Sequence, residues 1–416
     1  MRMKFNKSGQ LLLVSAASLD VAGLMSACST TLTVDFVYVT SQLAAGTNSY
    51  GEVDVFEVDS ESGHMRQIPT SPFPSGGRKP VAEATSTDQA DLYVVNEDDN
   101  SIVQFVIGND GKLYPYNTVN TPGVFPLAVA ANASNLFVVD TYQPLPTCST
   151  AAPCSGSIAV FPLAAGGSAS SAPCTATVCI QPAATNAGIS ANYWPLKLAG
   201  KPADVIVPTG VNVLASGTFV YVTAYDSSVA PNAGYVFGFS VGSGGVLTPL
   251  AGSPFAAGIL PSAIASDASS KYVYVTDYTS SNVRGFSVAS GQLIPLAGSP
   301  FPTGNAPSAI VVNPSFSFAY VTNSTDSSIS AYSMSNGVLT RIGSYPTGLQ
   351  PVAIGIDPST NHFLYTANFL GNDVSGFQLS QTAGTLLVSQ FSPFPSNSQP
   401  TAIAAIPHNG TGAGVH

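Results

Sequence analysis

Charged side chains are scarce in this chain of 416 residues. Lys and Arg number 12, Asp and Glu number 22, and together they make up only 8% of the sequence. The formal net charge is −10, and no basic cluster follows the N-terminal region. Proteins that bind nucleic acid need clustered Lys and Arg to contact the phosphate backbone. The sequence therefore predicts that nucleic acid is not a partner.

Long apolar runs are also missing after residue 27, where none reaches the roughly 18 residues that a membrane-spanning helix needs. The chain has four histidines and one tryptophan. Metal-binding cysteine spacings of the CxxC type are absent, and no histidine accompanies the cysteines. We therefore predict no metal site at the cysteines.

Cysteine itself is limited to five residues, four of which form two close pairs in one stretch. These pairs are Cys148 with Cys154 and Cys174 with Cys179. Short loops rich in Ala, Ser, Thr and Pro can close as disulfides in an oxidising compartment, and four free thiols are the alternative. The pairs favour two disulfides in an exported protein.

The N-terminus has the layout of an export signal. Arg2, Lys4 and Lys7 precede an apolar stretch over residues 11–19, and Leu-Met-Ser-Ala-Cys ends at Cys28. This layout resembles a bacterial lipoprotein signal. The resemblance implies a signal peptide over 1–27, lipidation of Cys28 and a linker over 28–35 that anchors the protein to a membrane of the cell envelope. The alternative is an N-terminal tail with an incidental cysteine.

One phrase recurs along the rest of the chain, which is rich in Gly (38) and Pro (32). Each copy begins at a proline and carries four short apolar runs separated by turn residues, and most intervals are in the forties. This period is typical of a β-propeller blade. We predict an all-β fold, a seven-bladed propeller of four-stranded antiparallel blades over 36–407, with an insertion at about 141–194 in the third unit and a flexible tail over 408–416. The anchoring residues are Pro80, Pro126, Pro202, Pro261, Pro307, Pro351 and Pro400.

The two ends of the repeat region complement each other. The first unit starts at residues 36–40, which correspond to a second strand, and residues 399–404 correspond to a first strand with nothing after it. Closing a ring removes exposed strand edges. We therefore predict that the C-terminal strand completes the N-terminal blade.

The repeat motifs resemble those of a known family. Tyr-Val-Thr-Asn at 320–323, with variants at 221–224 and 274–277, is similar to the signature of the YVTN-type propellers. The Leu-Thr-Pro-Leu-Ala-Gly-Ser-Pro-Phe run at 247–255 and its copy at 293–301 resemble lactonase-type seven-bladed propellers of the 6-phosphogluconolactonase-like kind. The resemblance implies a lactone hydrolase with His, Arg and Glu at the mouth of the central channel. The few histidines and arginines here match no catalytic position of that family.

Polar residues end most of the predicted second strands. They could face a shared pit and bind a divalent cation or the hydroxyls of a polyol. Alternatively, each caps its own turn through the backbone. The positions are Ser41, Asn96, Asp140, Ala224, Asp277, Asn323 and Asn368, of which Asn96, Asp140, Asp277, Asn323 and Asn368 are candidate ligand-binding residues.

Two carboxyl side chains break the pattern of the predicted inner strands. Glu83 stands where the other units align Val129, Val205, Ile264, Ile310, Ile354 and Ile403, and Asp204 stands where they have Ala. A charge there requires a partner or a proton. Arg78, Lys79 and Lys201 precede these strands, so either ion pairs or a catalytic cluster would result. In a lactonase, Glu83 or Asp204 would be the general base, with Arg78 and Lys201 stabilising the oxyanion.

Two functions follow from these observations. Because His and Arg are scarce, the first hypothesis is an exported, lipid-anchored and monomeric propeller that binds a protein or glycan partner on its loop face. The second, which the family resemblance implies, is hydrolysis of a sugar lactone at the mouth of the channel. We predict no cofactor for either function, with a divalent cation as the alternative.

Overall fold

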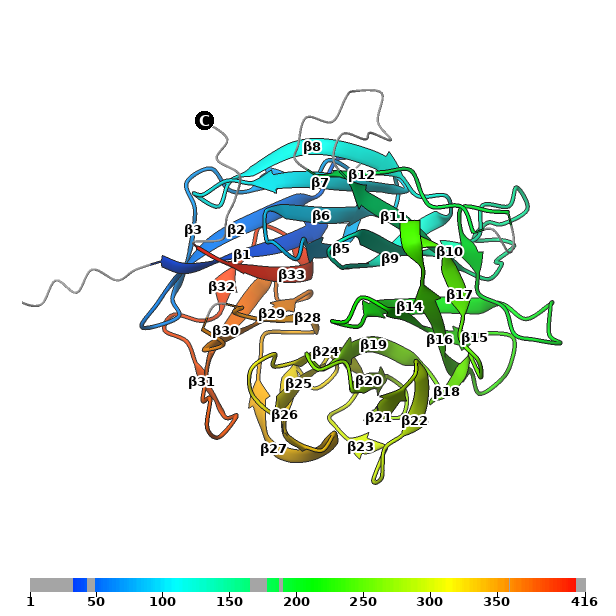
Figure 1. Ribbon diagram of the computed structural model, residues 1–416. Coiled ribbons are helices and arrows are strands. Elements are labelled where there is room, and N and C mark those ends of the chain that lie inside the picture. The colour runs from blue at the N-terminus through cyan, green and yellow to red at the C-terminus, as the bar shows by residue number, and fades with distance from the viewer. Residues whose placement is uncertain (1–32, 43–48, 165–177, 187–189, 359, 409–416) are drawn as a thin grey trace, which may run out of the picture.

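Seven small antiparallel sheets are arranged as the blades of a ring (Figure 1). The structure is a computed structural model and describes residues 33–42, 49–164, 178–186, 190–358 and 360–408. The all-β, seven-bladed prediction is confirmed. The predicted signal peptide, Cys28, Cys174 and residues 409–416 of the predicted tail lie outside the described residues. No described helix has the length and apolar character needed to span a membrane.

Each blade begins at the channel with an inner strand and continues outward. Blade 1 contains β33 (Gln399–Pro407), β1 (Thr33–Gln42), β2 (Glu52–Asp59), β3 (Met65–Gln67) and β4 (Phe73–Pro74). Blade 2 contains β5 (Pro80–Thr85), β6 (Asp91–Asn96), β7 (Ser101–Ile107) and β8 (Leu113–Asn120). Blade 3 contains β9 (Val124–Ala131), β10 (Asn135–Tyr142), β11 (Ser157–Ala164), β12 (Cys179–Ile180) and β13 (Trp194–Pro195).

The remaining four blades follow the same order. Blade 4 contains β14 (Ile206–Val213), β15 (Phe219–Asp226), β16 (Ala233–Val241), η1 (Ser243–Gly245), β17 (Leu247–Pro249) and β18 (Phe255–Gly258). Blade 5 contains β19 (Pro261–Ser266), β20 (Tyr272–Asp277), β21 (Asn282–Ala289), β22 (Gln292–Pro295) and β23 (Phe301–Pro302). Blade 6 contains β24 (Pro307–Val312), β25 (Phe318–Asn323), β26 (Ser328–Ser335) and β27 (Val338–Pro346). Blade 7 contains β28 (Pro351–Ile356), β29 (Phe363–Asn368), β30 (Asp373–Leu379), β31 (Leu386–Val388) and β32 (Phe394–Pro395).

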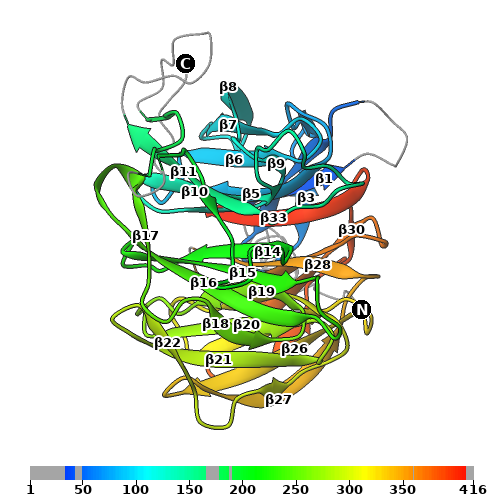
Figure 2. The ribbon, with the colours of Figure 1, turned by 90° about the vertical axis from the view of Figure 1, so that its right-hand side faces the viewer.

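The ring closes through the two ends of the repeat region, as the sequence predicted. β33 pairs antiparallel with β1, with Val39 opposite Ile403 and Thr40 opposite Ala402. Both views show β33 beside β1 (Figures 1 and 2). The pairing covers the edge of β1 that would otherwise be exposed.

The hydrophobic core is divided among the joints between blades. Each of the seven buried clusters draws its side chains from two neighbouring blades, as Tyr38 of blade 1 and Phe105 of blade 2 share one cluster. Alternating β-branched and aromatic residues place apolar side chains on both faces of each sheet, so every sheet packs against two neighbours. The apolar surface buried between blades therefore fixes the ring.

A tyrosine in the second strand ties many blades to the next one. Its side chain is fully buried, and its hydroxyl donates a hydrogen bond to a glycine carbonyl in the outer hairpin of the following blade. Buried hydroxyl groups need such partners. The four bonds are Tyr38 to Gly111 (3.1 Å), Tyr221 to Gly291 (2.8 Å), Tyr274 to Gly337 (2.8 Å) and Tyr320 to Gly384 (3.0 Å).

The anchoring proline of blade 4 lies six residues later than predicted, at Pro208. Pro208 pairs with Ala224, and after a bulge Gly210 pairs with Thr223, as Pro261 pairs with Asp277 and Ala263 with Thr276 in blade 5. Pro202 was therefore the wrong anchor. The run Lys-Pro-Ala-Asp at 201–204 imitates the start of an inner strand, whereas the true start has glycine in place of alanine.

The predicted insertion at about 141–194 is not one continuous loop. It contains β11, the third strand of blade 3, and the short strands β12 and β13. The alternating apolar residues of β11 pair with β10, and the extra residues lie before and after this strand. The extra residues are thus attached to blade 3 at both ends of β11, and they do not interrupt its sheet.

Candidate functional site

The seven inner strands enclose a channel cavity of about 260 Å³. The first lining residue after the anchoring proline carries a hydroxyl in four blades, the second is Ala or Gly, and the third is aliphatic in six blades. Small residues in the middle of each strand leave space at the axis. The four hydroxyl residues are Thr209, Ser262, Ser308 and Thr401.

Glu83 is the only ionisable side chain among the described residues that line this cavity. It projects from β5 at the third position, where Val211 of blade 4 is the true equivalent rather than Val205. The other equivalents are aliphatic as predicted. The Glu83 carboxyl group is thus the one acid on a wall whose other polar side chains are hydroxyls.

The Glu83 carboxyl group reaches from blade 2 to blade 1. Oε2 accepts a hydrogen bond from the Thr40 hydroxyl, and the backbone of Ala404 supplies a second hydrogen bond. Oε1 is buried without a hydrogen-bond partner in the described part of the chain. Desolvation outweighs both bonds and raises the pKa of Glu83 to about 8. The group is therefore mostly neutral at pH 7 and becomes a base above pH 8.

Hydroxyl groups near the start of the inner strands link successive blades. Ser262 Oγ donates to the carbonyl of Pro307 (2.6 Å), and Ser308 Oγ donates to that of Pro351 (2.6 Å). Across the closure, Thr401 Oγ1 donates to Pro80 (3.0 Å). Each hydroxyl keeps lone pairs that can accept a bond from a ligand in the channel.

The cations predicted beside Glu83 pair elsewhere. The Arg78 guanidinium contacts Asp99, with Nε to Oδ1 at 2.7 Å, and its backbone N–H donates to the same carboxylate. These contacts hold the pKa of Asp99 below its usual value even though burial opposes this shift. Lys79 Nζ lies 2.8 Å from Glu97. Both cations therefore brace the loop between β6 and β7.

Asp204 is not part of an inner strand, which corrects its predicted position. It lies in the connection before β14, 3.2 Å from Lys201 Nζ, and Lys201 also lies 3.8 Å from the buried Asp226. The predicted pairing of Lys201 with Asp204 is present. Because Asp204 is absent from the channel lining, it does not share a site with Glu83.

The polar residues that end the second strands are buried within their own blades and do not line the channel cavity. Asp277 Oδ2 accepts from the backbone N–H of Ile259 (2.9 Å), and Oδ1 accepts from that of Leu260 (3.1 Å). Asp140 accepts from Gly123 N–H (3.2 Å), and burial raises its pKa to about 7. The side chains thus hold the loops that lead into the inner strands.

The amides at equivalent positions behave in two ways. Asn368 donates to Ser375 Oγ (2.9 Å), and Asn323 accepts from Thr303 Oγ1 (2.9 Å). Both side-chain atoms of Asn96 are buried without partners in the described residues. A side chain on the leading-loop glycine Gly77 would clash with Asn96. Asn323 and Asn368 thus bond to side chains of nearby strands and loops, and none of the three amides lines the channel cavity.

The described residues contain no cluster of three or more His, Cys, Asp or Glu that could hold a metal ion. Cys148 and Cys154 form the first predicted disulfide, with Cα atoms 5.6 Å apart. Cys179 is also disulfide-bonded, and its predicted partner Cys174 lies outside the described residues. The disulfides belong to blade 3 and lie outside the channel lining.

The fold and this site define a seven-bladed β-propeller with one carboxyl group on its channel wall. The sequence matches the family described as lactonase, 7-bladed β-propeller, over residues 36–181 and 290–401. The chain therefore belongs to the lactonase family of seven-bladed β-propellers. The family resemblance predicted from the repeats is confirmed.

Solved structures share this architecture. A candidate 6-phosphogluconolactonase from Bacteroides fragilis has a TM-score of 0.69 and 18% identity, covering 91% of this chain and 99% of its own. The periplasmic gluconolactonase of Pseudomonas aeruginosa has a TM-score of 0.66 and 17% identity, covering 90% and 99%. At these identities the likeness concerns the fold. No curated protein sequence matches the chain.

The sequence pointed to Glu83 but missed the other polar groups of the cavity. The hydroxyls at 262, 308 and 401 follow the anchoring proline in each unit, and this fixed offset could have identified them as channel residues. Thr40 gave no such signal, since it belongs to the second strand of a different blade.

Proposed function

We propose that the protein hydrolyses a sugar lactone in the central channel and that Glu83 is the base that activates water. Membership of the lactonase family favours this activity over the partner-binding function that the scarcity of His and Arg suggested. The observation that carries the proposal is the position of Glu83, the one ionisable group among the described residues lining the cavity. Fold alone does not assign an activity, so the site must be tested directly.

The raised pKa suits Glu83 to this role. A carboxylate whose pKa is about 8 is a stronger base than an ordinary carboxylate, because burial disfavours its charge. In its ionised form it takes a proton from water as the oxygen attacks the lactone carbonyl. The tetrahedral intermediate then collapses, the ring C–O bond breaks, and the alkoxide takes the proton back from Glu83 to give the hydroxy acid and regenerate the base.

The channel hydroxyls would position the substrate. Thr209, Ser262 and Ser308 line the same cavity as Glu83, from blades 4, 5 and 6, and can accept hydrogen bonds from the hydroxyls of a sugar. Arg78 is held by Asp99, so we do not assign it to the oxyanion. This differs from the expectation drawn from the sequence.

A panel of sugar lactones, assayed with and without added divalent metal from pH 5.5 to 9.5, tests the proposal. We expect hydrolysis above the spontaneous rate that rises through about pH 8, following ionisation of Glu83. Glu83→Gln should abolish the enzymatic rate at every pH. An unchanged rate in this variant would remove Glu83 from the mechanism, and no hydrolysis by the wild type would overturn the activity.

We also propose that the protein is exported and anchored to the bacterial cell envelope through lipidated Cys28, as a monomer. The disulfide between Cys148 and Cys154 supports an oxidising compartment. Metabolic labelling with a fatty acid, compared between the wild type and Cys28→Ser, tests the anchor. Label that persists in the variant would contradict it.

A further inference from the structure

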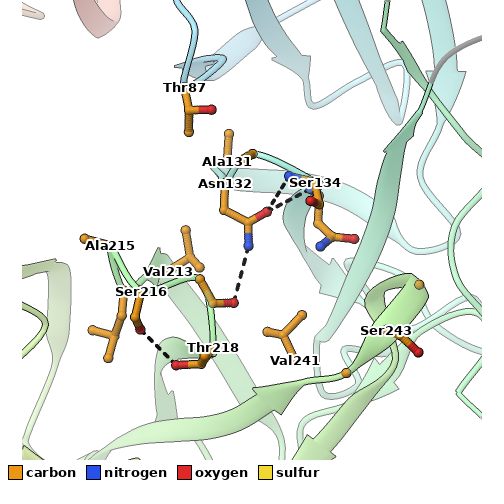
Figure 3. Close-up of a pocket in the computed structure, with 16 residues that line it drawn as sticks. Thr87, Ala131, Asn132, Ser134, Val213, Ala215, Ser216, Thr218, Val241 and Ser243 are labelled. Carbon is orange, nitrogen blue, oxygen red and sulfur yellow. Dashed lines mark hydrogen bonds between the residues drawn. The ribbon is translucent and has the colours of Figure 1, made fainter.

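A second pocket lies at the joint between blades 3 and 4, at the ends of their inner strands away from the leading loops. Its volume is about 560 Å³, within the range of roughly 300–1,000 Å³ typical of small-ligand sites. Its walls are the turn between β9 and β10, the turn between β14 and β15, and residues 241–244 at the end of β16 and just after it. Figure 3 shows Asn132, Thr218, Val241 and Ser243 around this space.

The joint beside the pocket lacks a ring contact that five other joints share. In five blades an aromatic ring, two residues before the second-strand tyrosine, fills the joint against a glycine of the next blade. Blade 3 has Asn135 at this position, and Phe137 replaces the tyrosine. Across the joint, Gly245 takes the place of the glycines that meet a ring elsewhere, and a β-carbon added to it would lie 2.9 Å from Asn135 Oδ1. The five ring contacts are Phe36 with Gly111, Phe219 with Gly291, Tyr272 with Gly337, Phe318 with Gly384 and Phe363 with Gly63.

Asn135 is a buried polar side chain that the protein leaves unused. The residue is 6% exposed and lines the pocket. Its backbone N–H donates to Asn132 Oδ1 (2.8 Å), but its carboxamide has no hydrogen-bond partner among the described residues. Neither carboxamide atom is both fully buried and unpaired, so the amide is open to the pocket and can bond to a ligand there.

The other lining groups extend this polar surface. Within the described residues, the hydroxyls of Thr87, Ser134 and Ser243 have no side-chain partner, whereas Ser216 and Thr218 bond to each other (2.8 Å). Val213 and Val241 add apolar surface. None of the lining residues is charged or aromatic.

We propose that this pocket is a binding site for a neutral saccharide. Hydroxyl and amide groups match the alternating donors and acceptors of a sugar, and the valines can contact its C–H surface. An ionised ligand would lose its hydration without meeting a counter-charge, which disfavours sugar acids and phosphates. The site is separate from the channel and does not depend on the proposed hydrolysis.

Titration of the full-length protein with glucose, maltose, cellobiose and lactose, followed by calorimetry and saturation-transfer NMR, tests the proposal. We expect at least one of these sugars to bind, and gluconate to bind no tighter than buffer controls. Asn135→Phe restores the aromatic residue of the other blades and should weaken binding by about tenfold or more, while the variant melts like the wild type.

A pair of surface variants distinguishes loss of the binding site from misfolding of the protein. Ser243→Trp places a bulky side chain at the exposed rim of the pocket, and Asn109→Trp places one on the corresponding exposed hairpin of blade 2. Only the first should reduce sugar binding. The proposal is overturned if no neutral sugar binds, if a neutral peptide binds at the pocket instead, or if Asn135→Phe and Ser243→Trp both bind sugar like the wild type.

Discussion

The Thr40 hydroxyl of β1 donates a hydrogen bond to the Glu83 carboxyl group of β5, so a polar contact joins blade 1 to blade 2 beside the channel. The six other blades have aliphatic residues at the position of Glu83. The joint therefore contains a buried acid whose protonation is coupled to folding.

Glu83→Gln should change how stability depends on pH. Glu83 has a folded pKa of about 8 and an ordinary value of 4.5, so the unfolded chain loses this proton first as pH rises. The stability that the proton provides is complete below pH 4.5 and is lost as pH rises to about 8, at up to about 1.4 kcal/mol per pH unit. Urea unfolding at pH 5 and pH 8 measures this decline.

The variant should lose less stability than the wild type between these two pH values, because glutamine stays neutral. Other buried acids titrate alike in both proteins and cancel in the comparison. Equal declines in the two proteins would show that the folded pKa of Glu83 is not raised.

Asp277→Ala should destabilise the protein by about 2–3 kcal/mol, because the leading-loop amides of Ile259 and Leu260 lose their acceptor. Asn96→Ala is the matched control, since both of its side-chain polar atoms lack partners in the described residues. The control should change stability much less. Thermal and urea unfolding compare the two, and equal losses would refute the loop-holding role.

Tyr320→Phe removes the hydrogen bond to the Gly384 carbonyl and should cost about 1 kcal/mol. Tyr93 occupies the same strand position in blade 2, but its buried hydroxyl has no partner among the described residues. Tyr93→Phe should therefore be neutral or stabilising. A larger loss for Tyr93→Phe than for Tyr320→Phe, measured by urea unfolding, would contradict the assignment of these bonds.

Ser308→Ala breaks the bond from blade 6 to the Pro351 carbonyl and should lower stability by about 0.5–1.5 kcal/mol. Ser308→Thr should retain the bond, because Thr401 makes the equivalent contact to Pro80. The melting temperatures of the two variants give the comparison. If the alanine variant melts no lower than the threonine variant, the bond does not contribute.

Deleting residues 399–416 removes β33 and should abolish cooperative unfolding, because β1 loses its partner and blade 1 its inner strand. Deleting 409–416 alone is the control and keeps β33 complete. Differential scanning calorimetry distinguishes the two outcomes. A single sharp transition in the shorter protein would mean that the ring does not require closure.

The repeated phrase was enough to predict the blades because each strand depends on local alternation and turn residues. Closure followed from residues 36–40 and 399–404, which complement each other as strands. The predicted anchor of blade 4 was wrong because both Pro202 and Pro208 are followed by residues typical of a strand. Only the pairing of Pro208 with Ala224 distinguishes them.

The site was harder to predict because it depends on contacts between blades. Glu83 stood out as an acid among aliphatic residues, but its partner Thr40 lies in another repeat. Arg78 was adjacent in sequence, yet the geometry of its loop directs it to Asp99. The pocket beside Asn135 could not be foreseen without knowing that the aromatic residues of the other blades contact glycines in the next blade.

The pairing of β1 with β33 sets the order of assembly during synthesis. β1 leaves the ribosome before every other described strand, and β33, which pairs with its inner edge, leaves after all of them. Until then a row of backbone donors and acceptors on β1 stays available to other chains, so a chaperone that shields nascent or translocating strands would raise the yield of folded protein.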